Sequence, residues 1–276
     1  MRAQSFLAAA LIIVVLPLLA SSITYADNIY VGCDNGTIIK LDSSGNRTTF
    51  ASGLTKIMGL AFDRSGNLYA SEWESKTIFK FDPSGNRSTF ASGFGATGLA
   101  FDSRGNLYVS DLGPGTIFKF DAGGNRSTFA SGLDYPDSLA CDSSGNLFAC
   151  TVDAIIKFDS GGNRSIFASG LLPMGLDFDS SGNLFTSNGD IVKFDSSGNM
   201  STFASGMYWG LALDNSGNVY ATDNTNAIFK FDPSGNMSTF ASGLDGPICI
   251  ATQIPEPCTL ILLGLGAAVV RKKVRN

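Results

Sequence analysis

One short motif, an apolar residue followed by Asp-x-x-Gly-Asn, recurs along the chain and limits the folds open to it. The motif occurs eleven times, with its Asp at Asp42, Asp63, Asp82, Asp102, Asp121, Asp142, Asp159, Asp179, Asp195, Asp214 and Asp232. Alternate copies belong to two classes. Copies of the class that begins with Asp42 are separated by 36 to 40 residues. A period of this length indicates the architecture before secondary structure is assigned to any segment, and here it gives six repeats.

Each repeat contains four short segments rich in Val, Ile, Phe, Tyr and Thr, separated by glycine-containing turns. In the repeat around Asp102 these segments are 98–101, 107–111, 116–120 and 126–132. Aromatic and β-branched runs bounded by turn residues are typical of strands. The Asp of the motif can accept hydrogen bonds from its own turn, and the Gly supplies a positive φ. We therefore expect four strands in each repeat.

Six units of four strands predict an all-β fold, a six-bladed β-propeller formed by residues 27–253. The first segment, 28–32, matches the second strand of a repeat, and the last segment, 246–250, matches the missing first strand. We expect this C-terminal strand to pair with the N-terminal blade and close the ring, which leaves no open sheet edge.

The two ends of the chain have the composition of targeting segments. Residues 1–26 combine Arg2, an apolar run and small residues before Asp27, which predicts a secretory signal peptide; the alternative is a retained membrane anchor. Residues 254–276 begin with Pro255, Glu256 and Pro257 and continue through a 13-residue apolar stretch. The chain then ends with a basic group that contains Arg271, Lys272 and Lys273. The apolar stretch is marginal for a membrane span, and the alternative here is an ordinary tail anchor.

This C-terminal segment closely resembles the PEP-CTERM sorting signal of bacterial exported proteins. The resemblance implies processing by an exosortase-type membrane protease, only transient contact of the segment with the membrane, and delivery to the cell surface or the extracellular matrix. The expected location is therefore the cell envelope, the cell surface or the extracellular space.

Composition excludes several kinds of chemistry. The chain has no histidine, so it can form neither a Ser-His-Asp relay nor a histidine-ligated metal site. Residues 27–253 contain 14 Lys and Arg against 23 Asp and Glu, which argues against nucleic-acid binding. The five cysteines are expected to be buried apolar residues rather than disulfides, and six regularly spaced lysines are expected to be solvated strand ends.

The repeats resemble NHL repeats and those of the related six-bladed gluconolactonase group, most clearly over 101–111 (Phe-Asp-Ser-Arg-Gly-Asn-Leu-Tyr-Val-Ser-Asp). The resemblance implies a propeller, which hosts binding proteins, lactonases and lyases alike. It also implies a divalent metal held by Glu, Asn and Asp at the blade entrances, where only Asp137 matches. A likeness to streptogramin lyases fails because their catalysis depends on histidine.

Residues that depart from the repeat gather in the loops between repeats and at the ends of the second strands, which propeller connectivity places on one face. We expect a ring of acidic and polar groups at the mouth of the channel, with aromatic residues beside it. The candidate ligand-binding residues are Glu72, Trp73, Asp111, Tyr135, Asp137, Asp177, Asn188, Tyr208, Trp209 and Asp223. The alternatives are that Asp177 forms a local polar patch and that Tyr208 and Trp209 plug the channel or cap the core.

Aromatic platforms beside carboxylates suit sugars, which present apolar CH faces and hydroxyls together. The favoured function is thus an exported, non-catalytic binding module for polysaccharide or a matrix protein, which requires no cofactor. The main alternative is a metal-dependent lactonase or hydrolase with Ca²⁺ or Mg²⁺ held by Glu72, Asp111, Asn188 and Asp223. A purely structural matrix component is a third possibility. The eleven turns are expected to be architectural, with a calcium-binding surface as the alternative.

Overall fold

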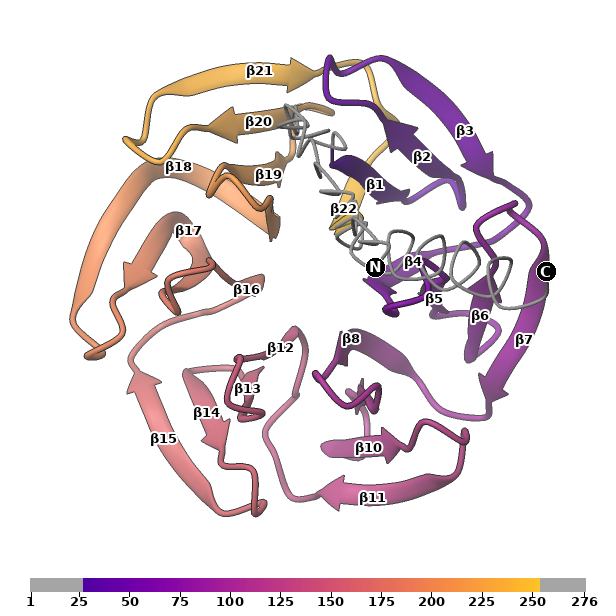
Figure 1. Cartoon of the computed structure of the whole chain (residues 1–276), viewed down its shortest axis with the longest axis vertical. Coiled ribbons are helices and arrows are strands. Elements are labelled where there is room, and N and C mark those ends of the chain that lie inside the picture. The colour runs from indigo at the N-terminus through magenta and orange to yellow at the C-terminus, as the bar shows by residue number, and fades with distance from the viewer. Residues whose placement is uncertain (1–26, 254–276) are drawn as a thin grey trace, which may run out of the picture.

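The computed structural model describes residues 27–253, and its strands form a ring of sheets around a central axis (Figure 1). Every regular element in that range is a β-strand. The all-β propeller predicted from the repeats is therefore confirmed. The predicted signal peptide and sorting signal lie outside the described residues. No helix in the described range is long and apolar enough to span a membrane.

Four of the sheets contain four strands each. The first has the order β22 (Pro247–Gln253), β1 (Asn28–Cys33), β2 (Ile38–Leu41), β3 (Arg47–Ala51). The second is formed by β4 (Ile57–Phe62), β5 (Leu68–Glu72), β6 (Thr77–Phe81), β7 (Arg87–Ser92). The third is formed by β8 (Ala96–Phe101), β9 (Leu107–Asp111), β10 (Thr116–Phe120), β11 (Arg126–Ala130). The fourth is formed by β12 (Leu139–Cys141), β13 (Leu147–Cys150), β14 (Ala154–Phe158), β15 (Arg164–Ser169).

The fifth sheet has six strands and differs from the expected pair of separate blades. Its order is β16 (Leu176–Phe178), β17 (Leu184–Phe194), β18 (Met200–Leu213), β19 (Val219–Asp223), β20 (Ile228–Phe231), β21 (Met237–Ala241). Strand β18 runs through the boundary between two repeats, and Tyr208 pairs with Gly189 on one side and Asp223 on the other. The linker here has three residues, 207–209, whereas the linker at 54–58 has five. A linker this short stays extended, so the two repeats share one continuous strand.

The last strand of the described chain lies beside the first. Strand β22 pairs with β1 in antiparallel register, from Asn28 opposite Gln253 to Gly32 opposite Cys249. It occupies the inner edge of that sheet, the position that the repeat comparison assigns to the missing first strand (Figure 1).

Aromatic rings connect neighbouring sheets. The Tyr69 ring contacts Phe90 of its own sheet and Phe101 of the next, each at a centroid distance of 5.0 Å. The six lysines expected to be solvated strand ends instead cover such rings, because their alkyl stems pack on the aromatic face. The pairs are Lys40 on Tyr30, Lys80 on Tyr69, Lys119 on Tyr108, Lys157 on Phe148, Lys193 on Phe185 and Lys230 on Tyr220.

Near the axis the backbones of neighbouring first strands approach each other closely. A Cβ on Gly98 would overlap the carbonyl oxygen of Asp137 in the next sheet, which explains the glycine. The buried hydroxyl of Ser110 donates to that same carbonyl at 2.6 Å and accepts from the Gly98 N–H at 2.7 Å. Equivalent hydroxyls of Ser71, Ser187 and Thr222 reach carbonyl oxygens of the next first-strand segment around the ring, which for Ser187 lies in the same sheet.

The eleven Asp-x-x-Gly-Asn turns use their carboxylates internally. In the first, Asp42 Oδ1 accepts from the N–H groups of Ser44 (2.9 Å) and Asn46 (3.0 Å), and Asn46 Nδ2 donates to Oδ2 (2.9 Å). The same bonds recur in the other ten turns, for example around Asp214. Gly45 has a φ of 80°, as this turn requires. We call the surface formed by these turns the turn face.

Candidate functional site

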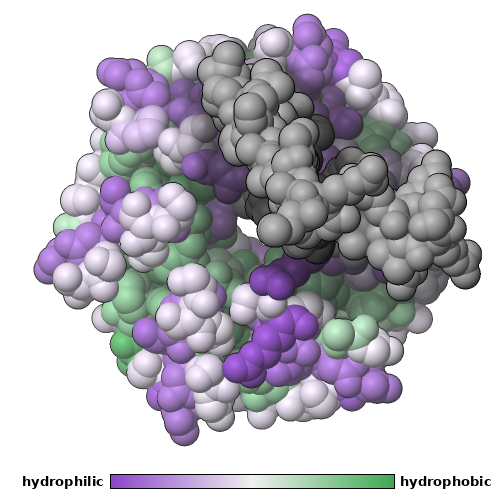
Figure 2. Space-filling view, viewed as in Figure 1, coloured by the Kyte–Doolittle hydropathy of each residue, from purple (hydrophilic) through white to green (hydrophobic). Residues whose placement is uncertain are grey.

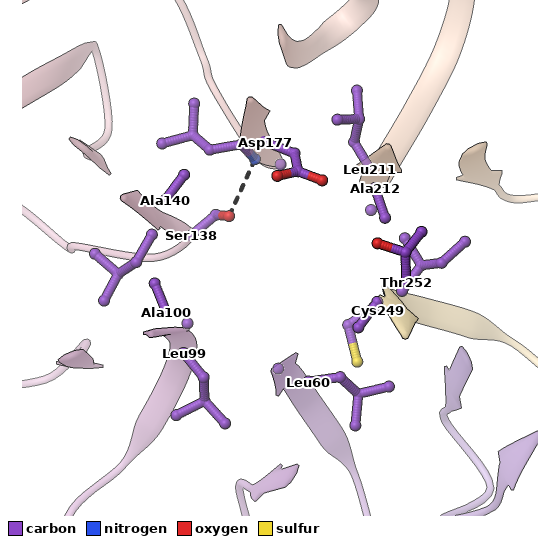
Figure 3. A pocket seen from close by; sticks show the side chains of 18 of the residues that line it. Leu60, Leu99, Ala100, Ser138, Ala140, Asp177, Leu211, Ala212, Cys249 and Thr252 are labelled. Atoms are coloured by element: carbon purple, nitrogen blue, oxygen red, sulfur yellow. Dashed lines mark hydrogen bonds between the residues drawn. The ribbon is translucent and has the colours of Figure 1, made fainter. Parts of the chain in front are cut away.

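A cavity of about 590 Å³ lies at the centre of the ring, lined by the first strands of the sheets. Its walls carry small and aliphatic side chains, among them Leu60, Leu99 and Ala100 (Figure 3). The space-filling view also shows the ring hollowed near its centre (Figure 2). Of the candidate residues predicted from sequence, the structure brings Asp137, Asp177 and Trp209 to this cavity.

Asp177 stands on β16 and faces the cavity at a position where the other repeats have alanine (Figure 3). Its Oδ2 accepts from the Leu213 N–H of the neighbouring first strand at 2.7 Å, and its Oδ1 accepts from the Phe178 N–H at 2.8 Å. Burial disfavours the charged carboxylate and raises its pKa to about 6, although the two hydrogen bonds oppose the shift. The carboxyl thus links two repeats while facing the cavity.

Asp137 lies just before β12, at the other end of the cavity wall. Repeat alignment places it level with Met58, Met174 and Trp209, which also line the cavity. Burial raises the pKa of its carboxyl, and a hydrogen bond with Thr97 acts in the opposite direction. Sequence comparison alone marks both carboxyls, because each stands at a repeat position where no other repeat has a charged residue.

Glu72, Asp111 and Asp223 end second strands, Asn188 lies at the equivalent position within the longer β17, and none of the four lines the cavity in the described structure. In place of the expected ring at its mouth, they bind nearby loops. Glu72 Oε1 accepts from the Thr55 N–H at 2.6 Å, and Asn188 Oδ1 accepts from the Leu172 N–H at 2.6 Å. The physical reason is position, since a second strand lies one strand further from the axis and its end meets unpaired loop N–H groups first.

The aromatic candidates occupy three different environments. Trp73 is 37% exposed, and its ring lies beside Gly95 together with the Asp111 carboxylate. Tyr135 is 60% exposed on the loop before β12. Tyr208 is buried against Phe231 and belongs to the core, whereas its neighbour Trp209 is 41% exposed and lines the cavity.

We call the surface opposite the turn face the loop face; it consists of the loops between repeats and the loops between second and third strands. Hydrogen bonds such as Leu112 N–H to Gly95 C=O connect the two kinds of loop. Several large apolar side chains are exposed there, and sequence reasoning missed the aliphatic ones. The set is Trp73, Tyr135, Val152, Leu172, Met174, Met207 and Trp209.

Charge is divided unequally between the two faces. The loop face carries ten carboxylates against Lys56 and Lys76, whereas the rest of 27–253 has 13 carboxylates and 12 basic side chains. The acidic excess of residues 27–253 is thus concentrated on the loop face. The set is Asp34, Glu72, Glu74, Asp111, Asp134, Asp137, Asp153, Asp190, Asp223 and Asp245.

No group of three or more His, Cys, Asp or Glu side chains within 27–253 is placed to hold a metal ion. The four candidate ligands from sequence bind separate loops, so this donor set does not fit the divalent metal implied by the gluconolactonase-like resemblance. The four cysteines of the described range are free thiols (Cys33, Cys141, Cys150 and Cys249).

Comparison with solved structures identifies propellers. A chain of a nidogen/laminin complex superimposes with a TM-score of 0.76 at 21% identity, over 84% of this chain and 100% of that one. A streptogramin B lyase gives 0.65 at 16% identity, over 81% and 83% of the two chains. A gluconolactonase from Xanthomonas campestris gives 0.65 at 16% identity, over 80% and 87%.

No protein-family model and no curated protein matches the chain. The similarity therefore establishes the propeller fold, which is shared by binding modules and by lactonase-like or lyase-like enzymes.

Proposed function

We propose that the chain is an exported binding module that recognises an extracellular polymer, a polysaccharide or a matrix protein, through its loop face. The observation that carries the proposal is the concentration of exposed aromatic and aliphatic side chains on one acidic face. Exposed apolar groups of this kind mark interaction sites on soluble proteins. Indole and phenol rings beside carboxylates provide both stacking and hydrogen bonding for a sugar.

The positions of the chain ends support the same face. Strand β1 begins and β22 ends at paired residues, Asn28 and Gln253. These ends adjoin the turn face, because the Asn215 N–H donates to Asp27 at 3.1 Å and Gly66 approaches Gln253. A sorting signal over 254–276, processed by an exosortase-type enzyme, leaves the loop face pointing away from the membrane and toward the matrix.

The proposal includes a ring of six blades. Two features support counting the six-stranded sheet as two blades joined by β18: the six sequence repeats and the bulges in β18 at the repeat boundary. The pairing of β22 with β1 supports closure of that ring.

Binding to matrix material tests the function. The purified chain is incubated with native extracellular polymer and with a glycan array, and retention is compared with that of a Trp73→Ala/Trp209→Ala variant. We expect the variant to lose at least about tenfold in affinity, since two stacking platforms disappear. An Ile166→Ala/Met200→Ala variant is the control, because those exposed residues lie on outer strands. Equal binding by all three proteins contradicts the proposal.

A metal-dependent lactonase or hydrolase is the alternative, favoured by the central cavity with its carboxyls Asp63, Asp137 and Asp177. Metal analysis of the purified chain distinguishes the two functions. A stoichiometric divalent ion that is lost in an Asp137→Ala variant supports the enzyme, whereas binding to matrix polymer that survives chelation supports the module.

A further inference from the structure

The central cavity combines a largely apolar wall with three carboxyls, Asp63, Asp137 and Asp177, and with one basic side chain, Arg64. The wall is formed by Leu60, Leu99, Leu211 and neighbouring alanines, which offer no polar side-chain groups (Figure 3). Pockets that are mostly apolar and contain a few convergent polar groups are typical of small-ligand sites, and about 590 Å³ lies within their usual size range.

Asp177 has unused capacity toward the cavity. An ionised carboxylate offers about four lone-pair sites, and the N–H groups of Leu213 and Phe178 occupy one on each oxygen. Within 27–253 the single ion pair joins Lys80 and Asp63; Arg64 also lines the cavity, but it lies more than 4.0 Å from the Asp177 carboxylate and forms no ion pair with it. A carboxylate facing an apolar space without a counter-ion is costly, and a ligand cation would remove that cost.

Asp137 adds a second carboxyl at a defined depth. Its aligned position precedes that of Asp177 by three residues along adjacent first strands, which corresponds to about 10 Å along the axis. Trp209 and Met174 line the cavity at the level of Asp137. Aromatic faces attract cations, and aliphatic side chains contact alkyl groups. The wall therefore suits a ligand that combines a cationic group with an alkyl body.

We propose that the central cavity binds a small organic cation, with a primary ammonium group held by Asp177 and an apolar body packed against the leucine and alanine wall. A diamine of suitable length engages Asp137 with its second ammonium group. Trp209, Met174 and Asp137 belong both to the loop face and to the cavity, but polymer binding and alkylamine binding are measured with different ligands, so either proposal can fail while the other stands.

Alkyl ligands of one shape and different charge test the proposal on the full chain. In a Trp73→Phe background Trp209 is the remaining tryptophan, so its fluorescence reports on the cavity. Hexylamine, hexanol and hexanoate are titrated, with calorimetry as a second readout. We expect hexylamine to bind at least about tenfold more tightly than hexanol, hexanoate to bind most weakly, and hexamethylenediamine to bind more tightly than hexylamine.

Two variants with the same change of charge locate the site. Asp177→Ala restores the alanine of the other repeats and is expected to fold while losing the preference for hexylamine over hexanol. Glu74→Ala removes an exposed carboxylate outside the cavity and is expected to keep that preference. Equal affinity for hexylamine and hexanol in the parent, or an unchanged preference in Asp177→Ala, overturns the proposal.

Discussion

At the scale of single residues, one substitution within the repeats gives the cavity wall a hydrogen-bonding group. Five repeats place alanine where the sixth has Asp177, and that side chain accepts a hydrogen bond from the otherwise free edge N–H of Leu213. Thr252 Oγ1 donates to the carbonyl of the same Leu213 at 2.8 Å. One residue, Leu213, is therefore connected to both neighbouring first strands, β16 and β22.

The raised pKa of Asp177 has a consequence for stability. Because its folded pKa of about 6 exceeds the ordinary 3.8, the native state binds the proton more tightly, and this contribution is lost as pH rises through 6. The full effect is at most about 3 kcal/mol. We expect Asp177→Asn to flatten the decline in unfolding free energy between pH 4 and 7, measured by urea titration. Glu74→Gln is the control, and parallel profiles for wild type and Asp177→Asn would refute this.

The serine hydroxyls that bond to neighbouring first strands also contribute to stability at the scale of single residues. Ser110→Ala leaves the buried Asp137 carbonyl without its 2.6 Å partner, so we expect a loss of about 1–3 kcal/mol in unfolding free energy. Ser103→Ala, at an exposed turn position of the same repeat, is expected to change stability by less than about 0.5 kcal/mol. Similar losses in the two variants would show that the hydroxyl contact contributes little.

At the scale of elements, β22 carries the connection between the two ends of the propeller. Cys249, Ile250 and Ala251 are buried, and Cys249 lies against Gly32, where four of the other repeats have a serine or threonine and one has Cys150. Without β22, β1 exposes an inner edge, and the hydroxyl of Thr252 no longer reaches Leu213.

Deletion of 246–253 together with the following tail is therefore expected to abolish cooperative thermal unfolding. Deletion of 254–276 alone retains β22 and serves as the control. Thermal melting followed by circular dichroism separates the two, and wild-type melting of the longer deletion would show that the pairing is dispensable.

The whole molecule should be most stable in mildly acidic solution. The carboxyls of Asp42, Asp82, Asp121, Asp159, Asp195 and Asp232 have lowered pKa values, mainly through hydrogen bonds from the Asn of the same turn. Their stabilisation is present above pH 3.8 and is lost as pH falls through their folded pKa values. Burial acts oppositely on Asp111, Asp137 and Asp177, whose contributions are lost as pH rises.

We thus expect a maximum in unfolding free energy between about pH 4 and 6. Chemical denaturation across pH 2 to 9 measures it. An unfolding free energy that rises steadily up to pH 9 would contradict the expected balance between the turn carboxyls and the buried carboxyls.

The sequence by itself determined the repeat, the strand-rich all-β fold and the place of the last strand beside the first, because local turn chemistry and alternation of apolar residues recur in every unit. It also marked Asp137, Asp177 and Trp209 as departures from the pattern. Only the tertiary structure decided which departures meet: the ends of second strands bind loops, while first-strand residues face the cavity. That outcome depends on distance from the axis and on unpaired loop N–H groups, which no single repeat contains. The merging of two repeats through β18 was likewise a result of three-dimensional strand pairing across a linker of only three residues.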